Sequence, residues 1–474
     1  MKRVNATIMK VAGLMGSLQM VNIICSILRS KLVAIWMGPA AMGLFGIFNS
    51  ALEMLSMLSQ MGLRPSAVRE LGMASNERVP RVVGVVRRVA LGLGLAGAAL
   101  TLVCSPLLSR LTFGDTSWWW AFASLALAVL LNALNNSESA IFQGLRRFRK
   151  LTRCTMAGVV GGCLISIPMF YFWRMQSIIP SILAYAICTW IALGLYRERI
   201  PRDESGSRRT LRDDLPMMRK MITFGAYLTA MGFITYAVNY LFMTILNHLA
   251  DPDTVGNYNA ASTLVNRYGA LVITALSMEY LPRLSAHCAS QRRTSVVISN
   301  QIFIVMLALI AVVPMFIALS QVLIRLLYSS AFLPSLPFLA IAAAALFFKG
   351  ISWCMATEII ARGDGRTFFV TEITSGLASL ILSTAGYLLG GFTGLGIAYA
   401  LWCAFYCAII AWVYFRRYRL RLTGTFTPIL LTASLTTLPT LLLALAGHPL
   451  RGLLIAIPSS LWALNRLRLK FLGR

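Results

Sequence analysis

Apolar runs recur along the whole chain of 474 residues at lengths that match membrane-spanning helices. Each run is mostly apolar over about 18 residues or more, roughly what a helix needs to cross a ~30 Å hydrocarbon core. The pattern predicts an all-α integral membrane protein with 12 to 14 transmembrane helices, because the last run is short. The predicted spans are 11–36, 40–63, 89–109, 117–143, 154–173, 177–196, 221–248, 255–281, 297–324, 333–361, 367–389, 392–415, 426–446 and 452–465.

Short motifs recur at nearly one offset and indicate two related halves. The pattern Pro-x-x-x-Gly-x-aromatic occurs at residues 39–45 and again, 213 residues later, at 252–258. Two further pairs lie 217 and 219 residues apart: Pro65 with Pro282, and Gly144 with Gly363. The repetition predicts duplication of a six-span unit, with chance matching of Pro and Gly in turns as the alternative.

The duplication predicts two six-helix lobes around a central cavity. A unit with an even number of spans repeats in the same orientation, so the lobes are expected to be related by an axis along the membrane normal. Substrate is then expected to bind between them. The predicted parts are an N-lobe at 1–196, a solvated cytoplasmic linker at 197–220, a C-lobe at 221–417, and an extra hydrophobic pair with a basic tail at 418–474.

The distribution of positive charge predicts the orientation of the chain. There are 43 Lys and Arg against 16 Asp and Glu, a net charge of +27, which in a soluble protein would suggest a nucleic-acid partner. Here 35 of the 43 fall in connections on the side of the termini and 4 on the opposite side. By the positive-inside rule both termini are predicted to be cytoplasmic, and a nucleic-acid partner is not expected.

Cysteine and histidine usage points away from metal and redox chemistry. The nine cysteines show no CxxC or other metal-ligand spacing, and all but Cys288 lie in or at the edge of spans. The three histidines fall in loops or at span ends. Neither a metal site nor another cofactor is therefore expected.

Four basic residues lie inside the predicted spans and are the candidate substrate-binding residues: Arg29, Lys31, Arg267 and Lys349. A charge at mid-membrane costs roughly 2.5–3.5 kcal/mol on insertion scales, so it normally faces water, a partner or a ligand. Guanidinium and ammonium groups in a cavity of low dielectric attract phosphate strongly. The set therefore predicts an anion site.

A structural interpretation of the same cations remains open. Arg29 or Lys31 could pair with Glu53, and Lys349 with Glu138 or Glu372. Lys31 could also extend to the outer interface. Each acid could carry a coupling proton or neutralise a neighbouring cation.

Polar residues at helical spacing form stripes on several spans. Such stripes are hard to leave facing lipid, because each buried polar group needs a partner, and they imply a hydrated cavity. Asn22 and Asn132 are the candidate cavity amides, whereas Asn135 and Asn136 are expected to join helices. The stripes are Gln19, Asn22, Ser26 and Arg29 in span 1; Asn49, Glu53, Ser56 and Gln60 in span 2; Asn132, Asn136, Ser139 and Gln143 in span 4; and Thr263, Arg267, Thr274 and Ser277 in span 8.

Residues 29–44 read R-x-K-L-x-A-x-x-x-G-P-x-x-x-G-L, a motif that begins in the first predicted span. The motif resembles the first-span signature of the Wzx-type flippases, which belong to the multidrug/oligosaccharidyl-lipid/polysaccharide exporter (MOP) superfamily. Residues 255–258 and 280–285 resemble the motifs that open and end span 8. Lys349 and Glu372 fall where such proteins carry Lys in span 10 and Glu in span 11.

The resemblance covers about residues 5–417 and implies a function. Such a flippase carries an undecaprenyl-diphosphate-linked oligosaccharide, for O-antigen or enterobacterial common antigen, across the bacterial inner membrane by alternating access, without catalysis. Its implied partners are bilayer lipids and, in the steps of polysaccharide biosynthesis that follow transport, a polysaccharide polymerase and a chain-length regulator. The apolar stretch after residue 425 departs from the 12-span pattern and is more like the lipid II flippases.

Three alternatives remain. One is a lipid II flippase, and another is a cation-coupled multidrug exporter of the same superfamily, for which acids and aromatic residues would suit cationic substrates better than Arg and Lys. The third is a membrane enzyme such as a polymerase or glycosyltransferase. The predicted outer loops, about ten residues or shorter, disfavour an enzyme because they leave no room for a catalytic loop.

Overall fold

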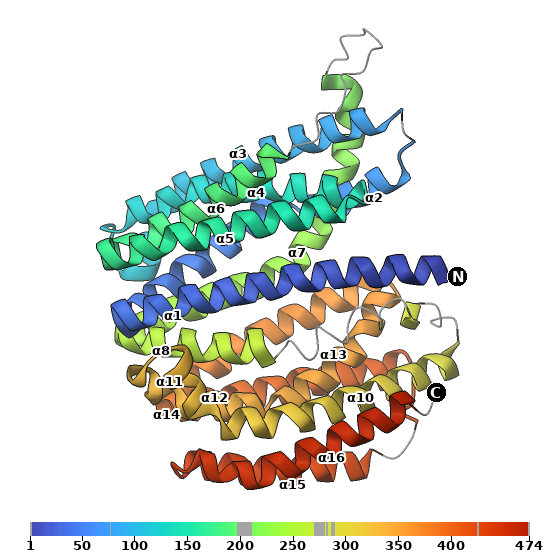
Figure 1. Cartoon of the computed structure of the whole chain (residues 1–474). Coiled ribbons are helices and arrows are strands. Elements are labelled where there is room, and N and C mark those ends of the chain that lie inside the picture. The colour runs from blue at the N-terminus through green and yellow to red at the C-terminus, as the bar shows by residue number, and fades with distance from the viewer. Residues whose placement is uncertain are drawn as a thin grey trace. The chain divides into compact units, whose positions relative to one another are not determined.

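The computed structural model describes residues 2–75, 77–196, 211–269, 280, 283–285, 290–423 and 426–472. Within these residues all regular structure is helical, which confirms the all-α prediction (Figure 1). The chain divides into two compact units, Met1–Val255 and Gly256–Arg474.

The helices have the length and composition of membrane spans. Among the described residues, seven are long and apolar enough to cross a bilayer, or eight if the bent pair Ser330–Ala344 and Leu346–Ala361 counts as one span. Three of the seven are 45, 48 and 53 residues long, more than twice the ~20 residues that one crossing needs. Each of these three is interrupted near its middle and therefore holds two spans. The protein is a multi-pass membrane protein.

The first unit is a set of long helices that pack side by side (Figure 1). Its elements are α1 (Lys2–Gln60), α2 (Leu63–Met73), α3 (Val79–Phe113), α4 (Trp119–Gly144), α5 (Phe148–Trp173), η1 (Arg174–Ser177), α6 (Ile178–Leu195) and α7 (Leu211–Leu249). Helix α3 packs on α4, α5 packs on α6, and α1 contacts α4, α5 and α7. A core of valine, alanine and leucine side chains joins α2, α3, α4 and α7.

A glycine divides α1 where the sequence predicts the connection between spans 1 and 2. Gly38 has φ 80° and ψ −173°, a conformation that other residues rarely adopt. Pro39 follows and starts the second half, where its missing N–H costs no hydrogen bond. The repeated motif begins a helix in the same way, because α8 (Pro252–Thr263) also starts at its proline.

The second unit is built around a central helix, α10, which packs on α12, α13, α15 and α16. The 48-residue α14 is divided at Gly390 and Gly391, between predicted spans 11 and 12. Besides α8, the elements of the second unit are η2 (Leu264–Gly269), α10 (Gln291–Ala318), α11 (Ser320–Leu327), η3 (Ser330–Ser335), α12 (Leu336–Ala344), α13 (Leu346–Ala361), α14 (Gly365–Trp412), η4 (Val413–Arg417), α15 (Thr427–Leu445), η5 (Pro449–Gly452) and α16 (Leu453–Leu472). The last predicted span, marginal in the sequence, is part of a 20-residue helix.

Two connections differ from the sequence prediction. Residues 64–88 were expected to be an extramembrane connection, but α2 and the first turns of α3 occupy most of it. Helix α2 forms because Leu63, Ala67 and Leu71 recur every four residues and bury one face. It is too short and too charged to be read as a span.

The predicted linker at 197–220 is partly helical. Residues 197–210 lie outside the described part, whereas 211–220 form the start of α7. Helix α7 packs on α1, α2 and α3 and belongs to the first compact unit, so the units divide after Val255. The lobe boundaries drawn from the sequence stay a prediction.

Candidate substrate site around the intramembrane cations

Arg29 lies on the first half of α1 against two aromatic rings. Its guanidinium carbon is 5.4 Å from the ring centre of Phe45, on the second half of α1, and 5.0 Å from that of Tyr185, on α6. The side chain is half-buried. Both distances are within the range of a cation–π interaction, which stabilises a desolvated cation.

The neighbours of Arg29 on α1 divide between two faces. Asn22 is half-buried and lies two turns before Arg29 on the same face, as the polar stripe predicts. Lys31 is also half-buried, but a separation of two residues turns it about 200° around the helix. Lys31 therefore does not share the Arg29 face, and it has no hydrogen-bond partner within the described residues.

The polar stripes of spans 2 and 4 face each other within the first unit. The Asn132 amide on α4 donates to Ser56 Oγ on α1 at 3.3 Å. Glu53, one turn before Ser56, is exposed. Asn135 donates to the Ala186 carbonyl oxygen on α6 at 3.2 Å, which confirms its predicted role in joining helices. Part of the predicted cavity lining is thus used in helix packing.

Glu138 on α4 is held by an arginine that the sequence placed outside the spans. Arg87 on α3 donates from Nε to Oε1 at 2.7 Å and from Nη2 to Oε2 at 3.0 Å. Of the two interpretations of Glu138, the structure contains the neutralised carboxylate. Arg87 was counted with an extramembrane connection because the predicted span began at residue 89, whereas α3 begins ten residues earlier.

A second acid of the first unit joins α7 to α3. Asp214 is 2% exposed and accepts hydrogen bonds from Arg81 Nε at 2.8 Å and from Arg88 Nη2 at 2.7 Å. Arg81 and Arg88 are seven residues apart and therefore lie on one face of α3. The sequence assigned Asp214 to a solvated linker, and this pairing was not predicted.

Lys349 in the second unit is held by neutral groups. Its Nζ donates to Asn266 Oδ1 at 2.9 Å and lies 3.4 Å from Tyr399 Oη. The Tyr399 hydroxyl donates to the same Asn266 oxygen at 3.0 Å, which closes a triangle between α13, α14 and the π-helical turn η2. Within the described residues Lys349 makes no ion pair, so its positive charge is not neutralised there.

Glu372 has a hydroxyl partner and no cation in the described part of the chain. The Tyr406 hydroxyl donates to Glu372 Oε1 at 2.9 Å, between the two halves of α14. The possible ion pair with Lys349 is therefore not formed there. Arg267 lies in η2, directly after Asn266, but its side chain is outside the described part.

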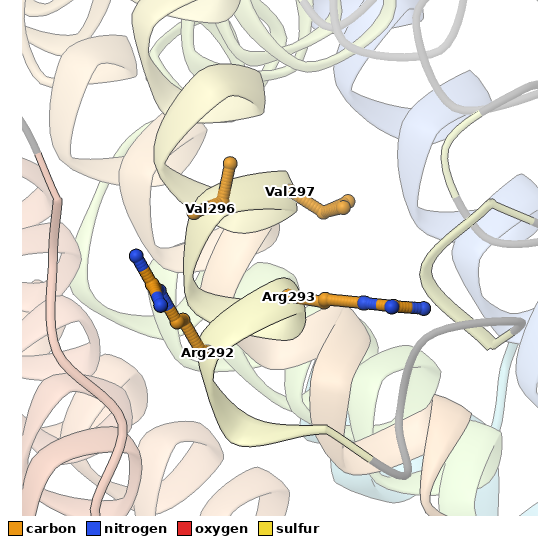
Figure 2. A pocket seen from close by; sticks show the side chains of 4 residues that line it. All are labelled: Arg292, Arg293, Val296 and Val297. Atoms are coloured by element: carbon orange, nitrogen blue, oxygen red, sulfur yellow. The ribbon is translucent and has the colours of Figure 1, made fainter.

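A surface hollow of about 480 Å³ lies at the start of α10, lined by Arg292, Arg293, Val296 and Val297 (Figure 2). The two arginine side chains extend to different sides of the helix, and the valines lie one turn further on (Figure 2). Because the guanidinium groups diverge, they do not converge on one anion. The intramembrane cations remain the better candidate site.

Sequence reasoning missed the residues that hold the cations. Phe45 and Tyr399 lie in apolar runs, where an aromatic residue is expected to face lipid or pack in the core. Tyr185 gives no periodic signal of its own. Asn266 had one indication, since it directly precedes an intramembrane arginine. Only the crossing of the helices shows which ring meets which cation.

Long apolar helices in two compact units define a polytopic membrane protein, and known structures share this fold. The inward closed conformation of the lipid II flippase MurJ matches with a TM-score of 0.72 and 14% identity, covering 98% of this chain and 100% of that one. An inward-facing multidrug resistance MATE family transporter of the MOP superfamily matches with a TM-score of 0.68 and 14% identity, covering 86% and 96%.

The family follows from the sequence match. The family model described as polysaccharide biosynthesis protein matches residues 32–337, more than half of the chain, and the chain belongs to this family. Similar proteins include the lipid III flippases of Escherichia coli (strain K12) and Shigella flexneri. Each is 22% identical over 390 residues, which cover 80% of this chain and 91% of the relative. The resemblance to Wzx-type flippases is confirmed.

Proposed function

We propose that this chain is a flippase that moves a lipid-linked oligosaccharide across a membrane by alternating access, and that it is not an enzyme. The observation that carries the proposal is Lys349, a cation inside a membrane span whose partners are neutral groups. A charge inside a span that has no neutralising acid among the described residues is expected to serve an anionic ligand. The names of the lipid III flippase relatives support the same substrate class.

The finer proposal concerns the substrate and its setting. The ligand is an undecaprenyl-diphosphate-linked glycan, of the O-antigen or enterobacterial common antigen type, in the bacterial inner membrane. Both termini are cytoplasmic, as the positive charge of the connections indicates. The lipid tail stays among bilayer lipids while the head crosses, and the product passes to a polymerase and its chain-length regulator.

The proposed roles of the candidate residues follow from the chemistry of their side chains. Arg29, Lys31, Arg267 and Lys349 bind the diphosphate, because Arg offers paired N–H donors and Lys a compact positive charge. Asn22, Asn132 and Glu53 line the path of the polar head. Their contribution is hydrogen bonding to sugar hydroxyls.

Glu372 is the acid that we propose for energy coupling. Glu138 already accepts two hydrogen bonds from Arg87, whereas the partner of Glu372 among the described residues is the neutral Tyr406 hydroxyl. A carboxyl group whose neighbours are neutral can gain or lose a proton with little rearrangement of them. Glu372→Gln is expected to make transport insensitive to collapse of the proton gradient.

The proposal is tested by transport in proteoliposomes with a fluorescent glycan on undecaprenyl diphosphate. Arg29→Ala and Lys349→Ala are expected to slow movement of the probe between leaflets at least about tenfold, since charged hydrogen bonds contribute roughly 1.5–3 kcal/mol. Arg325→Ala removes an exposed arginine of α11 and is the matched control. Wild-type rates for both cation variants would refute the assignment of the site.

A multidrug exporter is the second candidate, because the fold is shared with MATE transporters. Its substrates are often cationic and would be repelled by Arg29 and Lys349. Cells that overproduce the protein are expected to remain sensitive to cationic dyes. Resistance to the dyes, together with no movement of the lipid probe, would favour this alternative.

A further inference from the structure

The repeated motif ends in an aromatic residue that contacts an intramembrane cation directly in the first unit and through other rings in the second. The motif ends in Phe45 in the first unit and in Tyr258 in the second, 213 residues later. Phe45 lies 5.4 Å beneath the Arg29 guanidinium. The corresponding relationship in the second unit is indirect and passes through two further rings.

Aromatic contacts lead from Tyr258 to the lysine of the second unit. The rings of Tyr258 and Phe338 are 5.3 Å apart, and those of Phe338 and Tyr399 are 6.1 Å apart in an edge-to-face arrangement. The Tyr399 hydroxyl then contacts Lys349 Nζ at 3.4 Å. Phe338 and Tyr399 are buried, at 1% and 8% exposure, so the contacts fix the place of the hydroxyl.

Rings are suited to hold a cation that must also bind an anion. A ring attracts a guanidinium through its face and adds no formal negative charge. The N–H groups at the edge of the guanidinium are the ones that phosphate binds, and ring contacts do not use them. A ring therefore fixes the orientation of the cation and leaves its binding edge to a ligand.

Phe48, another phenylalanine of α1, differs from Phe45 in its contacts. Phe48 is 1% exposed and packs on Phe113, Trp118 and Phe122 at 5.2–6.1 Å between ring centres. Its ring lies over no cation among the described residues. Phe45 and Phe48 thus share a helix and a residue type, but only Phe45 contacts Arg29.

We propose that Phe45 and Tyr258 are positioning residues that orient Arg29 and Lys349, one in each unit, for the phosphate groups of the substrate lipid. The inference rests on the proposed function, because it takes these two cations to bind a diphosphate. It explains why the motif ends in an aromatic residue in both halves. Neither residue needs to touch the substrate.

The test compares binding of two lipids to the full chain in detergent: undecaprenyl diphosphate and undecaprenol, which lacks phosphate. Phe45→Leu is expected to weaken binding of undecaprenyl diphosphate about three- to tenfold, between the sizes of an exposed and a fully desolvated cation–π interaction, because Arg29 is half-buried. Binding of undecaprenol is expected to stay unchanged. Phe45→Tyr retains a ring and is expected to restore affinity, while Phe48→Leu, the matched control, affects stability alone.

A double-mutant cycle separates positioning from general packing. If Phe45 acts through Arg29, then Phe45→Leu causes no further loss of affinity for undecaprenyl diphosphate in a protein that already carries Arg29→Ala. Tyr258→Leu is expected to behave in the same way with Lys349→Ala. Its control is Tyr328→Leu, which removes a buried tyrosine whose ring packs on Phe332 at 5.3 Å between ring centres. Additive losses, or equal losses for both lipids, would overturn the inference and leave the proposed function intact.

A different binding result would contradict the proposed function itself. If Arg29→Ala and Lys349→Ala bind undecaprenyl diphosphate as the wild type does, then these cations do not hold the diphosphate. The positioning roles fall with them. A loss in both cation variants combined with wild-type binding by Phe45→Leu and Tyr258→Leu overturns the inference alone.

Discussion

Arg87 donates two hydrogen bonds to the carboxylate of Glu138, Nε to Oε1 at 2.7 Å and Nη2 to Oε2 at 3.0 Å. The side chains are 21% and 13% exposed. A paired contact of this kind matches the planar fork of arginine to both carboxylate oxygens, and lysine cannot reproduce it. The pair joins α3 to α4.

Breaking this pair is expected to destabilise the first unit. Arg87→Ala leaves Glu138 without its paired donor, at a cost between the ~1 kcal/mol of an exposed pair and the ~3–5 kcal/mol of a fully buried one. The thermal unfolding midpoint of the purified protein measures the effect. Arg153→Ala, which removes an exposed arginine of α5, is the control.

Replacing both Arg87 and Glu138 tests whether the unpaired charge causes the loss of stability. Arg87→Met with Glu138→Leu removes both charges. The double variant is expected to recover part of the decrease in unfolding midpoint that Arg87→Ala causes, because no charge is left unpaired. A double variant less stable than either single variant would contradict a simple ion pair.

Asp364 is expected to stabilise the start of α14 in a pH-dependent way. Its carboxylate accepts from Thr367 N at 3.1 Å, Thr367 Oγ1 at 2.7 Å and Tyr418 Oη at 3.0 Å, and Arg417 Nη2 is 3.1 Å away. Partial burial alone would raise the pKa of Asp364, but the hydrogen bonds and the Arg417 charge outweigh it and lower the pKa below the ordinary value of 3.8.

A lowered pKa means that the folded state prefers the ionised group. The stabilisation is therefore present above pH 3.8 and is lost as the pH falls through the lower pKa of the folded state. Asp364→Ala is expected to cost about 1 kcal/mol at pH 7, as for other helix caps, and less in acid. Asp364→Asn retains a helix-capping side chain without a titratable group, so its stability should change less with pH than that of the wild type. Unfolding midpoints at pH 7 and pH 3 provide the measurement, and equal differences at both would contradict the role of ionisation.

The Tyr399 hydroxyl is expected to matter for transport and not for folding. Tyr399→Phe retains the ring contacts with Phe338 and Trp402 but removes the hydrogen bonds to Lys349 and Asn266. Transport of the lipid probe should slow roughly fivefold, which corresponds to about 1 kcal/mol for a hydrogen bond. Tyr280→Phe removes a buried hydroxyl that donates to the Cys354 carbonyl oxygen and should lower stability instead. Wild-type transport by Tyr399→Phe would show that the hydroxyl does not hold Lys349.

Gly225 on α7 is expected to tolerate no side chain. A Cβ at this position would overlap the carbonyl oxygen of Met61, which is backbone and cannot turn away. Gly225→Ala should lower stability by roughly 1–3 kcal/mol or prevent folding, as overpacking does. Gly194→Ala on α6 meets open space and should be neutral or stabilising. A folded, fully stable Gly225→Ala protein would show that α7 and the turn between α1 and α2 do not approach so closely.

Hydropathy was sufficient to place most of the spans, because a lipid environment requires long apolar runs and satisfied backbone groups. Gly38 and the pair Gly390–Gly391 divide helices between predicted spans, since glycine tolerates the conformation that each break needs. Helix α2 was missed because its apolar face is only three residues long. A short amphipathic helix has no hydropathy signal comparable to that of a span.

Partners of the charged residues were harder to predict than the charges themselves. The insertion cost of a charge makes Arg29 and Lys349 stand out in the sequence. Their partners depend on how helices cross, and Tyr185 lies more than 150 residues from Arg29 along the chain. Arg87 was counted with a connection because α3, with basic residues in its first turns, begins ten residues before the apolar part that the sequence predicts as a span.

The Asp214 pairings have a consequence for the order in which the protein is made. Arg81 and Arg88 are synthesised 133 and 126 residues before the acid that binds them. In the orientation proposed above, both arginines carry charge that Asp214 does not yet offset while the first spans enter the membrane, and this charge favours keeping their segment on the side of synthesis. The two side chains can bind Asp214 only after α7 has been made. In that orientation the same arginines would contribute first to insertion and then to the packing of α3 on α7.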